Sequence, residues 1–351
     1  MTGRTPEARA DDDRLERQKE NRVTTPSRTF GGKRLRGLVL AATGMLALSA
    51  CGSPAPAVIA APGVKPTSCG TVRLALNAWA GYAANAAVIS YLARQELGCE
   101  VKLVKENEED SWKHLAQGKV DAILENWGHD DLKKKYIDNE KVAVEAGLTG
   151  NRGVIGWYTT PYMAEKYPDI TKWRNLRRYA PLFRTPASGD QGQFLDGDPT
   201  YVTNDKALVK NLKLDYKVVF AGSEDALIAA FRKAEKEKTP LLGYFYSPQW
   251  LLSEIKLVNI PLPAYTPGCD ANPDTVACDY QPYDLDKIAN KKFAYSGSPA
   301  ATLIKNFRWT NEDQNQVARD MTTQGLTADQ AAKKWLDENR AVWTKWLPSR
   351  T

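Results

Sequence analysis

The sequence is poor in the residues and motifs that most metal and nucleophilic sites use. Its 351 residues include two histidines, His114 and His129, and five cysteines without a Cys-x-x-Cys pair. Structural zinc sites are built from such clusters, so a metal site is the weaker explanation for the cysteines. The G-x-S-x-G motif that marks many α/β hydrolases is also lacking. We therefore predict neither a metal ion nor a cofactor.

A concentrated excess of positive charge is lacking as well. Of 48 Lys and Arg and 42 Asp and Glu, 10 basic and 6 acidic residues lie in positions 1–36, which leaves 38 basic and 36 acidic residues in the rest. Nucleic-acid binding needs a basic face, which near-balance does not supply. We predict that nucleic acid is not a partner.

A short apolar run near the beginning of the chain is typical of an export signal. Residues 37–50 are uncharged, follow the basic segment 33–36 and precede Cys51. The run is too short to span a bilayer comfortably, and small residues precede the cysteine. The ending Leu-Ser-Ala-Cys matches the bacterial lipobox, in which Cys51 becomes the lipidated first residue. We predict a lipoprotein on the extracytoplasmic face of the cell membrane, with an uncleaved anchor as the alternative.

The segments around this signal are expected to lie outside the folded part. Residues 1–50 comprise an N-terminal extension and the signal peptide, and residues 51–69 form a tether rich in Pro, Ala and Gly. The polar stretch 1–29 is either a disordered cytoplasmic extension, or the true start lies further downstream, for example at Val23 read from an alternative start codon.

The remaining four cysteines are an even number in an exported chain, which suggests two disulfides with three connectivities open. Cys69 and Cys99 each precede a predicted strand, and neighbouring parallel strands would place them side by side. Cys269 and Cys278 bracket a turn-rich loop. We predict the pairs Cys69–Cys99 and Cys269–Cys278.

From Thr71 onward, short apolar runs alternate with helical patterns. Strands are expected at 72–76, 100–104 and 120–124, with helices at 83–97 and 111–117 between them. This alternation implies right-handed parallel crossovers and an α/β fold. Further strands are expected at 142–145, 153–162, 180–185, 216–220, 241–246 and 256–261, and further helices at 132–137, 205–212, 223–238, 285–290, 300–307, 312–325 and 328–346.

Aromatic residues stand at the ends of two of these strands. Trp79 follows the first strand within Asn77–Tyr82, where a glycine-rich phosphate loop is absent, and Trp127 follows the third strand within Glu125–Asp130. The carboxyl ends of parallel strands are where α/β sheets bind ligands. The pattern predicts a ligand held by ring faces.

Four motifs in this order resemble the substrate-binding proteins of ABC transporters for glycine betaine, proline betaine and choline. They are N-x-W-x-G at residue 77, D-A-x-x-x-x-W at residue 121, G-x-x-G-W-x-x-x-P-Y at residue 153 and Y-x-P-x-W at residue 246. The resemblance implies a two-lobe periplasmic-binding-protein-like fold of type II, in which each lobe is a sheet flanked by helices and the ligand lies in the cleft between them. Lobe 1 would comprise 70–156 and 251–351, and lobe 2 would comprise 157–250.

The resemblance also implies which residues bind the ligand. The quaternary ammonium group would sit in a box of Trp or Tyr rings, and a carboxylate would be bound by backbone N–H groups and polar side chains of the opposite lobe. The matching ligand-binding positions are Trp79, Trp127, Trp157, Tyr246 and Gln249. Gln249 stands where a histidine is frequent, and Tyr246 where a tryptophan is common. Further candidates are Tyr82, Asp130, Ser188 and Gly189.

A quaternary ammonium group cannot donate hydrogen bonds, so each ring face contributes attraction of roughly 0.5–2 kcal/mol. Core packing is the alternative role for these aromatics, and it is the expected role of Trp112, Trp173, Trp309, Trp335, Trp343 and Trp346. We predict that the protein is a monomer and not an enzyme. It is expected to capture glycine betaine and deliver it to a permease with its ATPase. The alternatives are choline or carnitine binding, an extracellular hydrolase using Glu125 or Asp130, and a ligand sensor without a permease.

Overall fold

The computed structural model describes residues 69–349. The predicted signal peptide, the lipidation site Cys51 and the tether up to residue 68 lie outside the described residues. The strands are β1 (Thr71–Leu76), β2 (Glu100–Lys105), β3 (Ala122–Asn126), β4 (Ala143–Thr159), β5 (Gly192–Asp196), β6 (Tyr216–Phe220), β7 (Leu242–Ser247), β8 (Val258–Asn259) and β9 (Tyr283–Asn290). The helices are α1 (Ala80–Gln95), α2 (Glu108–Ala116), α3 (Asp130–Lys133), α4 (Pro161–Lys166), α5 (Leu176–Tyr179), α6 (Asp205–Asn211), α7 (Glu224–Glu237), α8 (Leu251–Glu254), α9 (Lys291–Ala294), α10 (Pro299–Asn306), α11 (Asn311–Thr322), α12 (Ala328–Glu338) and α13 (Arg340–Trp343).

The strands form one mixed sheet in the order β2-β1-β3-β9-β4-β7-β5-β6, with β8 added against β4. Parallel pairs join β1 to β2 and β3, and join β5 to β6 and β7. Strand β9 is antiparallel to both β3 and β4, and β7 is antiparallel to β4. The 17-residue β4 connects the part of the sheet that contains β1, β2, β3 and β9 to the part that contains β5, β6 and β7. Its first residues pair with β9 and its last residues pair with β7.

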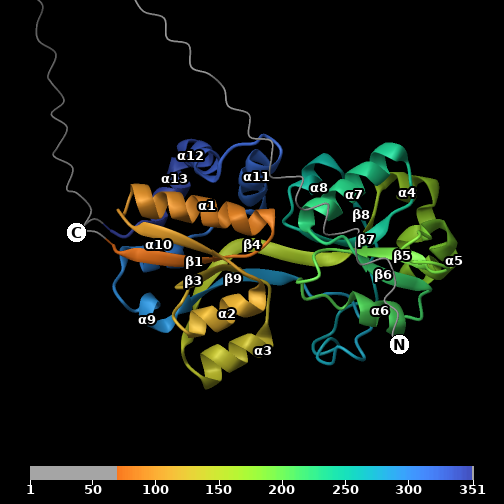
Figure 1. Cartoon of the computed structure of the whole chain (residues 1–351), viewed down its shortest axis with the longest axis horizontal. Helices are drawn as coiled ribbons and strands as arrows, with labels where there is room; N and C mark the ends of the chain where they lie inside the picture. Colours follow the sequence, from red (N-terminus) through yellow and green to blue (C-terminus); the bar gives the residue numbers. More distant parts are fainter. Residues whose placement is uncertain (1–68, 350–351) are drawn as a thin grey trace, which may run out of the picture. The chain divides into compact units, whose positions relative to one another are not determined.

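Helices α1, α11 and α12 pack together although α1 lies far from the other two in the sequence (Figure 1). Helix α1 is rich in alanine and is buried along most of its length. Small side chains allow this close packing on several sides. Helices α11 and α12 each begin with a capping box, led by Thr310 and Thr327. These caps satisfy backbone N–H groups that a helix start would otherwise leave without partners. In the part of the chain that is described, no helix combines the length and apolarity required to cross a membrane.

The segment expected as a helix at 285–290 is strand β9 instead. Its polar residues are buried by contacts that only the folded chain provides. The carboxylate of Asp286 accepts from Lys133 at 2.7 Å, and Asn290 donates to the carbonyl of Leu115 at 2.8 Å. The side chain of Lys287 is fully buried and donates to two backbone carbonyls. The sequence prediction was wrong here because these partners are remote in sequence.

The expected strand at 180–185 is also wrong. Residues Ala180–Phe183 form a 3₁₀ turn, with Pro181 in its first turn, and the strand of this region is β5, which begins at Gly192. Proline lacks the N–H that a central strand needs, which disfavours a strand here. The two strands expected at 142–145 and 153–162 are the single strand β4.

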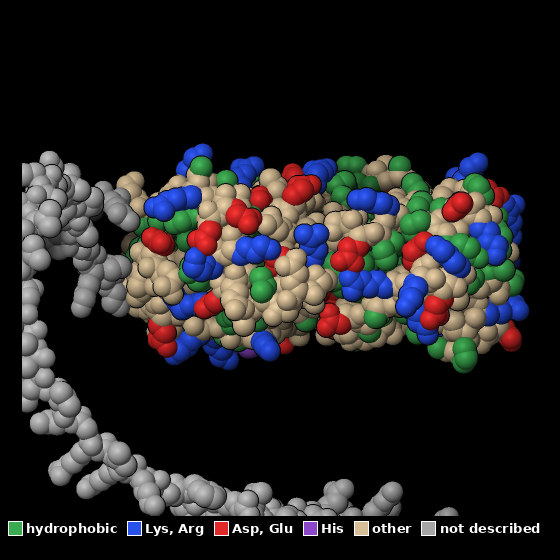
Figure 2. Space-filling model, turned by 90° about the horizontal axis from the view of Figure 1, so that it is seen from above, with side chains coloured by type: hydrophobic (Ala, Val, Ile, Leu, Met, Phe, Trp, Pro, Cys, Tyr) green, Lys and Arg blue, Asp and Glu red, His purple; other side chains and the backbone are tan. Residues whose placement is uncertain are grey.

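Two disulfides join Cys69 to Cys99 and Cys269 to Cys278. The first lies beside the parallel pair of β1 and β2. The second closes the loop between β8 and β9. On the surface, Figure 2 shows Lys and Arg side chains interspersed with Asp and Glu over the visible face, as the near-balance of charge indicates.

Candidate functional site: an aromatic cavity

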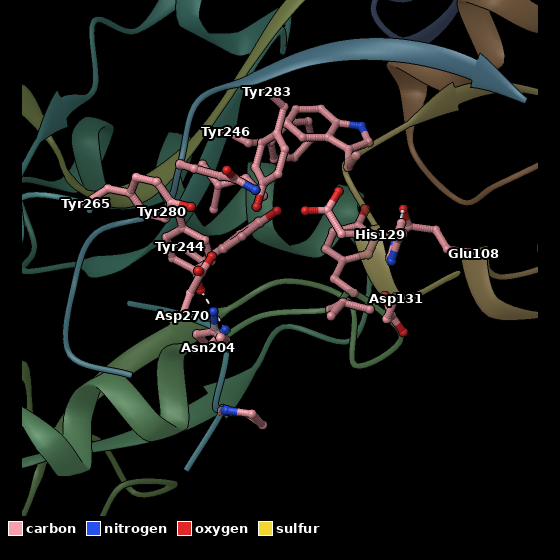
Figure 3. A pocket seen from close by; sticks show the side chains of 18 of the residues that line it. Glu108, His129, Asp131, Asn204, Tyr244, Tyr246, Tyr265, Asp270, Tyr280 and Tyr283 are labelled. Carbon is pink, nitrogen blue, oxygen red and sulfur yellow. Dashed lines mark hydrogen bonds and ion pairs between the residues drawn. The ribbon is translucent and has the colours of Figure 1, made fainter. Parts of the chain in front are cut away.

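A cavity of about 650 Å³ opens beside the carboxyl ends of β1 and β3 (Figure 3). This volume is typical of small-molecule sites. Aromatic side chains dominate its wall: Trp79, Trp127, Tyr201, Tyr244, Tyr246, Tyr265, Tyr280 and Tyr283. These residues come from the turns after β1 and β3, from β7, from the start of β9 and from the loops that follow β5 and β8. The cavity is thus built from segments on both sides of β4.

The rings contact one another in a chain around the cavity. The ring of Trp127 meets Tyr246 edge to face, with 5.7 Å between centroids, and meets Tyr283 at 6.0 Å. Trp79 meets Tyr201 at 6.0 Å, also edge to face. Such T-shaped pairs are favourable arrangements of aromatic quadrupoles. The contacts hold several ring faces and edges around one space.

A single buried carboxylate anchors both tryptophans. The indole N–H groups of Trp79 and Trp127 each donate to Oε1 of Glu125 at 2.8 Å. The other oxygen of Glu125 accepts from Gln314 at 2.7 Å and from Asn85. Glu125 is 1% exposed. Four N–H donors on one carboxylate fix the orientation of the two rings.

Burial raises the pKa of Glu125 to about 7, although the four hydrogen bonds act in the opposite direction. Desolvation disfavours the charged form, whereas donors favour it. All the donors belong to the protein, so this carboxylate is occupied in holding side chains. Glu125 therefore acts as a positioning residue rather than as a group presented to a ligand.

Two glycines make room for this arrangement. A Cβ at Gly81 would lie 2.3 Å from Nε2 of Gln314, and a Cβ at Gly153 would lie 2.6 Å from Cζ3 of Trp127. Both distances are too short for any larger residue without displacement of these side chains. The first glycine lets Gln314 reach Glu125, and the second lets the Trp127 ring lie against β4.

The cavity is also lined by acidic side chains. Glu108, Asp130 and Asp131 line it together with His129, and Asp270 lies beside Tyr244 and Tyr280. Figure 3 shows Glu108, His129 and Asp131 across the cavity from the tyrosines. No lysine or arginine occurs among the described residues of the lining. The wall therefore carries a negative potential.

His129 forms a hydrogen-bonded pair with Glu108, at 2.9 Å from Nε2 to Oε1. Burial lowers the pKa of His129, but the bond to Glu108 and the nearby aspartates outweigh it and leave the pKa above its usual range. When protonated, His129 offsets only one of the four carboxylates.

The structure brings together four of the residues expected from the sequence. Trp79, Trp127, Tyr246 and Asp130 all line the cavity. Trp157 is not among the lining residues, because its side chain is fully buried and its Nε1 donates to Asp205 at 2.6 Å.

Four other expected residues also lie outside the lining. Gln249 is 3% exposed and donates to Oε1 of Glu224 at 3.1 Å. Tyr82 is buried, and its hydroxyl accepts the N–H of Leu124. Ser188 bonds to Thr185 within its own turn, and Gly189 follows it there.

Several lining residues were not expected from the sequence. Tyr244 precedes Tyr246 by two residues on β7, so strand alternation was a usable signal for it. Tyr201, Tyr280 and Tyr283 stand outside any recognised motif, and their place depends on how the loops fold. Between residues 69 and 349, no group of His, Cys, Asp and Glu side chains has a metal-binding arrangement.

Comparison with solved structures identifies the fold. The chain resembles the closed, glycine betaine-bound lactococcal OpuAC, with a TM-score of 0.63 and 20% identity over 80% of this chain and 100% of that one. It resembles equally an ABC-transporter choline-binding protein in complex with choline, with a TM-score of 0.63 and 18% identity over 79% of this chain and 91% of that one. The fold is that of a type II periplasmic binding protein.

Sequence comparison then gives the family. The model described as the substrate-binding domain of the ABC-type glycine betaine transport system matches residues 70–338, and the chain belongs to this family. A relative is the trimethylamine N-oxide-binding protein of Pelagibacter ubique (strain HTCC1062), which is 26% identical over 260 residues, covering 71% of this chain and 82% of that protein. The family is one of solute-binding proteins and not of enzymes.

Proposed function

We propose that this protein captures a quaternary ammonium solute in the aromatic cavity and delivers it to the permease of an ABC importer. The observation that carries the proposal is the convergence of Trp79, Trp127 and Tyr246 on one cavity that is also lined by four carboxylates. Ring faces attract a cation that has no hydrogen to donate, and carboxylates add a long-range attraction. Family membership agrees with this use.

The sequence favours glycine betaine as the ligand, with choline or carnitine as alternatives. Relatives and similar structures carry different ligands in their names, namely glycine betaine, choline and trimethylamine N-oxide. All three are N-methylated compounds without an N–H group, which the aromatic cavity suits. We therefore propose that the ligand is an N-methylated compound of this class.

We also propose a cellular location for the protein. A lipid on Cys51 would anchor the chain as a monomer to the outer side of the cell membrane, and the two disulfides suit an oxidising compartment. We propose further that 70–156 with 251–351 and 157–250 are two lobes that close on the ligand. Strand β4, shared by both parts of the sheet, is a suitable connection.

Calorimetry on the purified protein tests the function. We expect saturable binding of at least one of glycine betaine, choline, carnitine, proline betaine and trimethylamine N-oxide. Trp79→Ala and Trp127→Ala are each expected to weaken binding at least tenfold, because each removes ring faces from the cavity. If neither substitution changes the affinity, the cavity is not the binding site.

A further inference from the structure

Glu224 is a buried carboxylate directly behind the aromatic wall. It is the first residue of α7, is 6% exposed and does not itself line the cavity. Helix α7 follows β6, whereas α1 follows β1, and these strands lie on opposite sides of β4 in the sheet. The carboxylate of Glu224 nevertheless reaches the beginning of α1.

Three donors converge on Glu224. Its Oε2 accepts the backbone N–H of Ala80 at 2.7 Å, and its Oε1 accepts from the hydroxyl of Tyr246 and from Nε2 of Gln249 at 3.1 Å. Ala80 directly follows Trp79, which provides no side-chain cap for α1. The carboxylate thus satisfies an N–H group that the start of a helix leaves free, where negative charge is also favoured.

These donors are the types that an anionic ligand group would need. A carboxylate of a bound solute is held in proteins by backbone N–H groups and polar side chains. Here a backbone N–H, a phenol and an amide beside the cavity rings already bind the carboxylate of Glu224. Burial raises the pKa of Glu224, and the three hydrogen bonds oppose this because they favour the ionised form.

The other side chains that line the cavity also disfavour a ligand that carries a carboxylate. Four carboxylates line the cavity, and among its described lining residues no lysine or arginine offers a counter-charge to an anion. A zwitterion would bring its own carboxylate towards these groups, and like charges in a partly desolvated site repel. A ligand with only a positive charge meets no such repulsion.

We propose that Glu224 takes the place of a ligand carboxylate, so that the site selects quaternary ammonium compounds that carry no carboxylate, of which choline is the simplest hydroxylated example. The proposal rests on the proposed function and narrows its substrate class. Asp130 and Asp131 then supply acceptors for a ligand hydroxyl. In this respect the structure favours the choline-type alternative over the glycine betaine expected from the sequence.

The test compares two ligand pairs by calorimetry on the full chain. Choline and tetramethylammonium lack a carboxylate, whereas glycine betaine and carnitine carry one. In the wild-type protein we expect choline and tetramethylammonium to bind at least tenfold more tightly than either zwitterion. Glycine betaine binding as tightly as choline overturns the inference while leaving the proposed function intact. Absence of binding by all four ligands overturns the proposed function and the inference with it.

Two variants examine the role of Glu224 itself. Glu224→Gln removes the charge, and we expect the preference for choline over glycine betaine to fall at least threefold. Asp225→Asn is the matched control, because Asp225 is the next residue of α7, is exposed and undergoes the same change of charge. It is expected to leave the preference unchanged. Equal weakening of all ligands by Glu224→Gln, with the preference unchanged, overturns the inference.

Tyr246→Phe provides a second route if Glu224→Gln does not fold. It keeps the ring but removes one donor to Glu224. Because Glu224 keeps its charge and loses a partner, we expect the discrimination against glycine betaine to persist. Recovery of tight glycine betaine binding in this variant contradicts the inference.

Discussion

Trp79 and Trp127 donate their indole N–H groups to the same oxygen of one buried carboxylate, at 2.8 Å each. The two rings stand at the ends of different strands, 48 positions apart in the sequence. Their common acceptor, Oε1 of Glu125, links their orientations. Movement of either ring therefore changes the hydrogen bonding available to the other.

This shared acceptor can be tested by keeping the ring and removing the N–H. We expect Trp79→Phe and Trp127→Phe to weaken ligand binding about three- to tenfold, less than the alanine variants, since an aromatic face remains but its orientation is freer. Calorimetry with the best ligand gives the measurement. Trp173→Phe, outside the cavity, is the control and is expected to bind normally. Equal losses in the Phe and Ala variants would contradict a role for the N–H bonds.

Glu125 should give the protein a distinctive pH dependence of stability. Its folded-state pKa is about 7, above the ordinary value of 4.5, so the folded state retains a proton that the unfolded state releases. The resulting stabilisation is complete below pH 4.5 and is lost as pH rises through about 7. The loss amounts to at most about 3 kcal/mol.

Urea unfolding between pH 5 and 8 measures this effect. Glu125→Gln is expected to flatten the decline relative to the wild type. The variant can fold because Oδ1 of Asn85 and Oε1 of Gln314 have no partner in the described structure, so their amides can turn to accept from the new N–H₂ group. A decline of equal slope in both proteins would show that other groups control it.

Gly153→Ala should weaken binding although it replaces no lining residue. A Cβ at this position would lie 2.6 Å from Trp127, so the ring must move. We expect a loss of affinity of at least threefold, seen by titration with ligand. Gly156→Ala is the matched control on the same strand, because its Cβ would meet Asn259 instead. The idea fails if both alanine variants behave alike.

Trp157→Phe should separate stability from binding. Trp157 is buried outside the cavity and donates to the buried Asp205. The substitution leaves that carboxylate with one donor fewer, which costs about 1–3 kcal/mol of unfolding free energy. Affinity is expected to remain within about twofold of the wild type. A tenfold loss of affinity at unchanged stability would instead place Trp157 in the binding site.

The sequence predicted those parts whose signals are local. Strand β1, helix α1 and strand β3 follow apolar runs and helical spacing, and the tryptophans after the two strands reach the cavity as their positions suggest. Strand β9 was missed because the burial of Asp286 and Lys287 depends on remote partners. A single sequence shows no trace of those contacts.

In the site too, residues with a local sequence signal were predicted and residues placed by remote contacts were not. Tyr201 and Tyr283 lie in or next to loops, where no periodicity indicates which side chains face inward. Gln249 was expected to bind the ligand, but it donates to Glu224, the first residue of α7, which no motif singled out. The role of such a donor depends on which partner the fold supplies.

The loop closed by Cys269 and Cys278 contributes Asp270, Ala271 and Pro273 to the cavity wall. Because the bond joins residues nine positions apart, this part of the wall is a small covalent ring. We expect it to move as one unit, so that ligand exchange depends on a single loop displacement rather than on many independent side-chain motions. The residence time of the solute would then be shorter in a reducing medium than in an oxidising one.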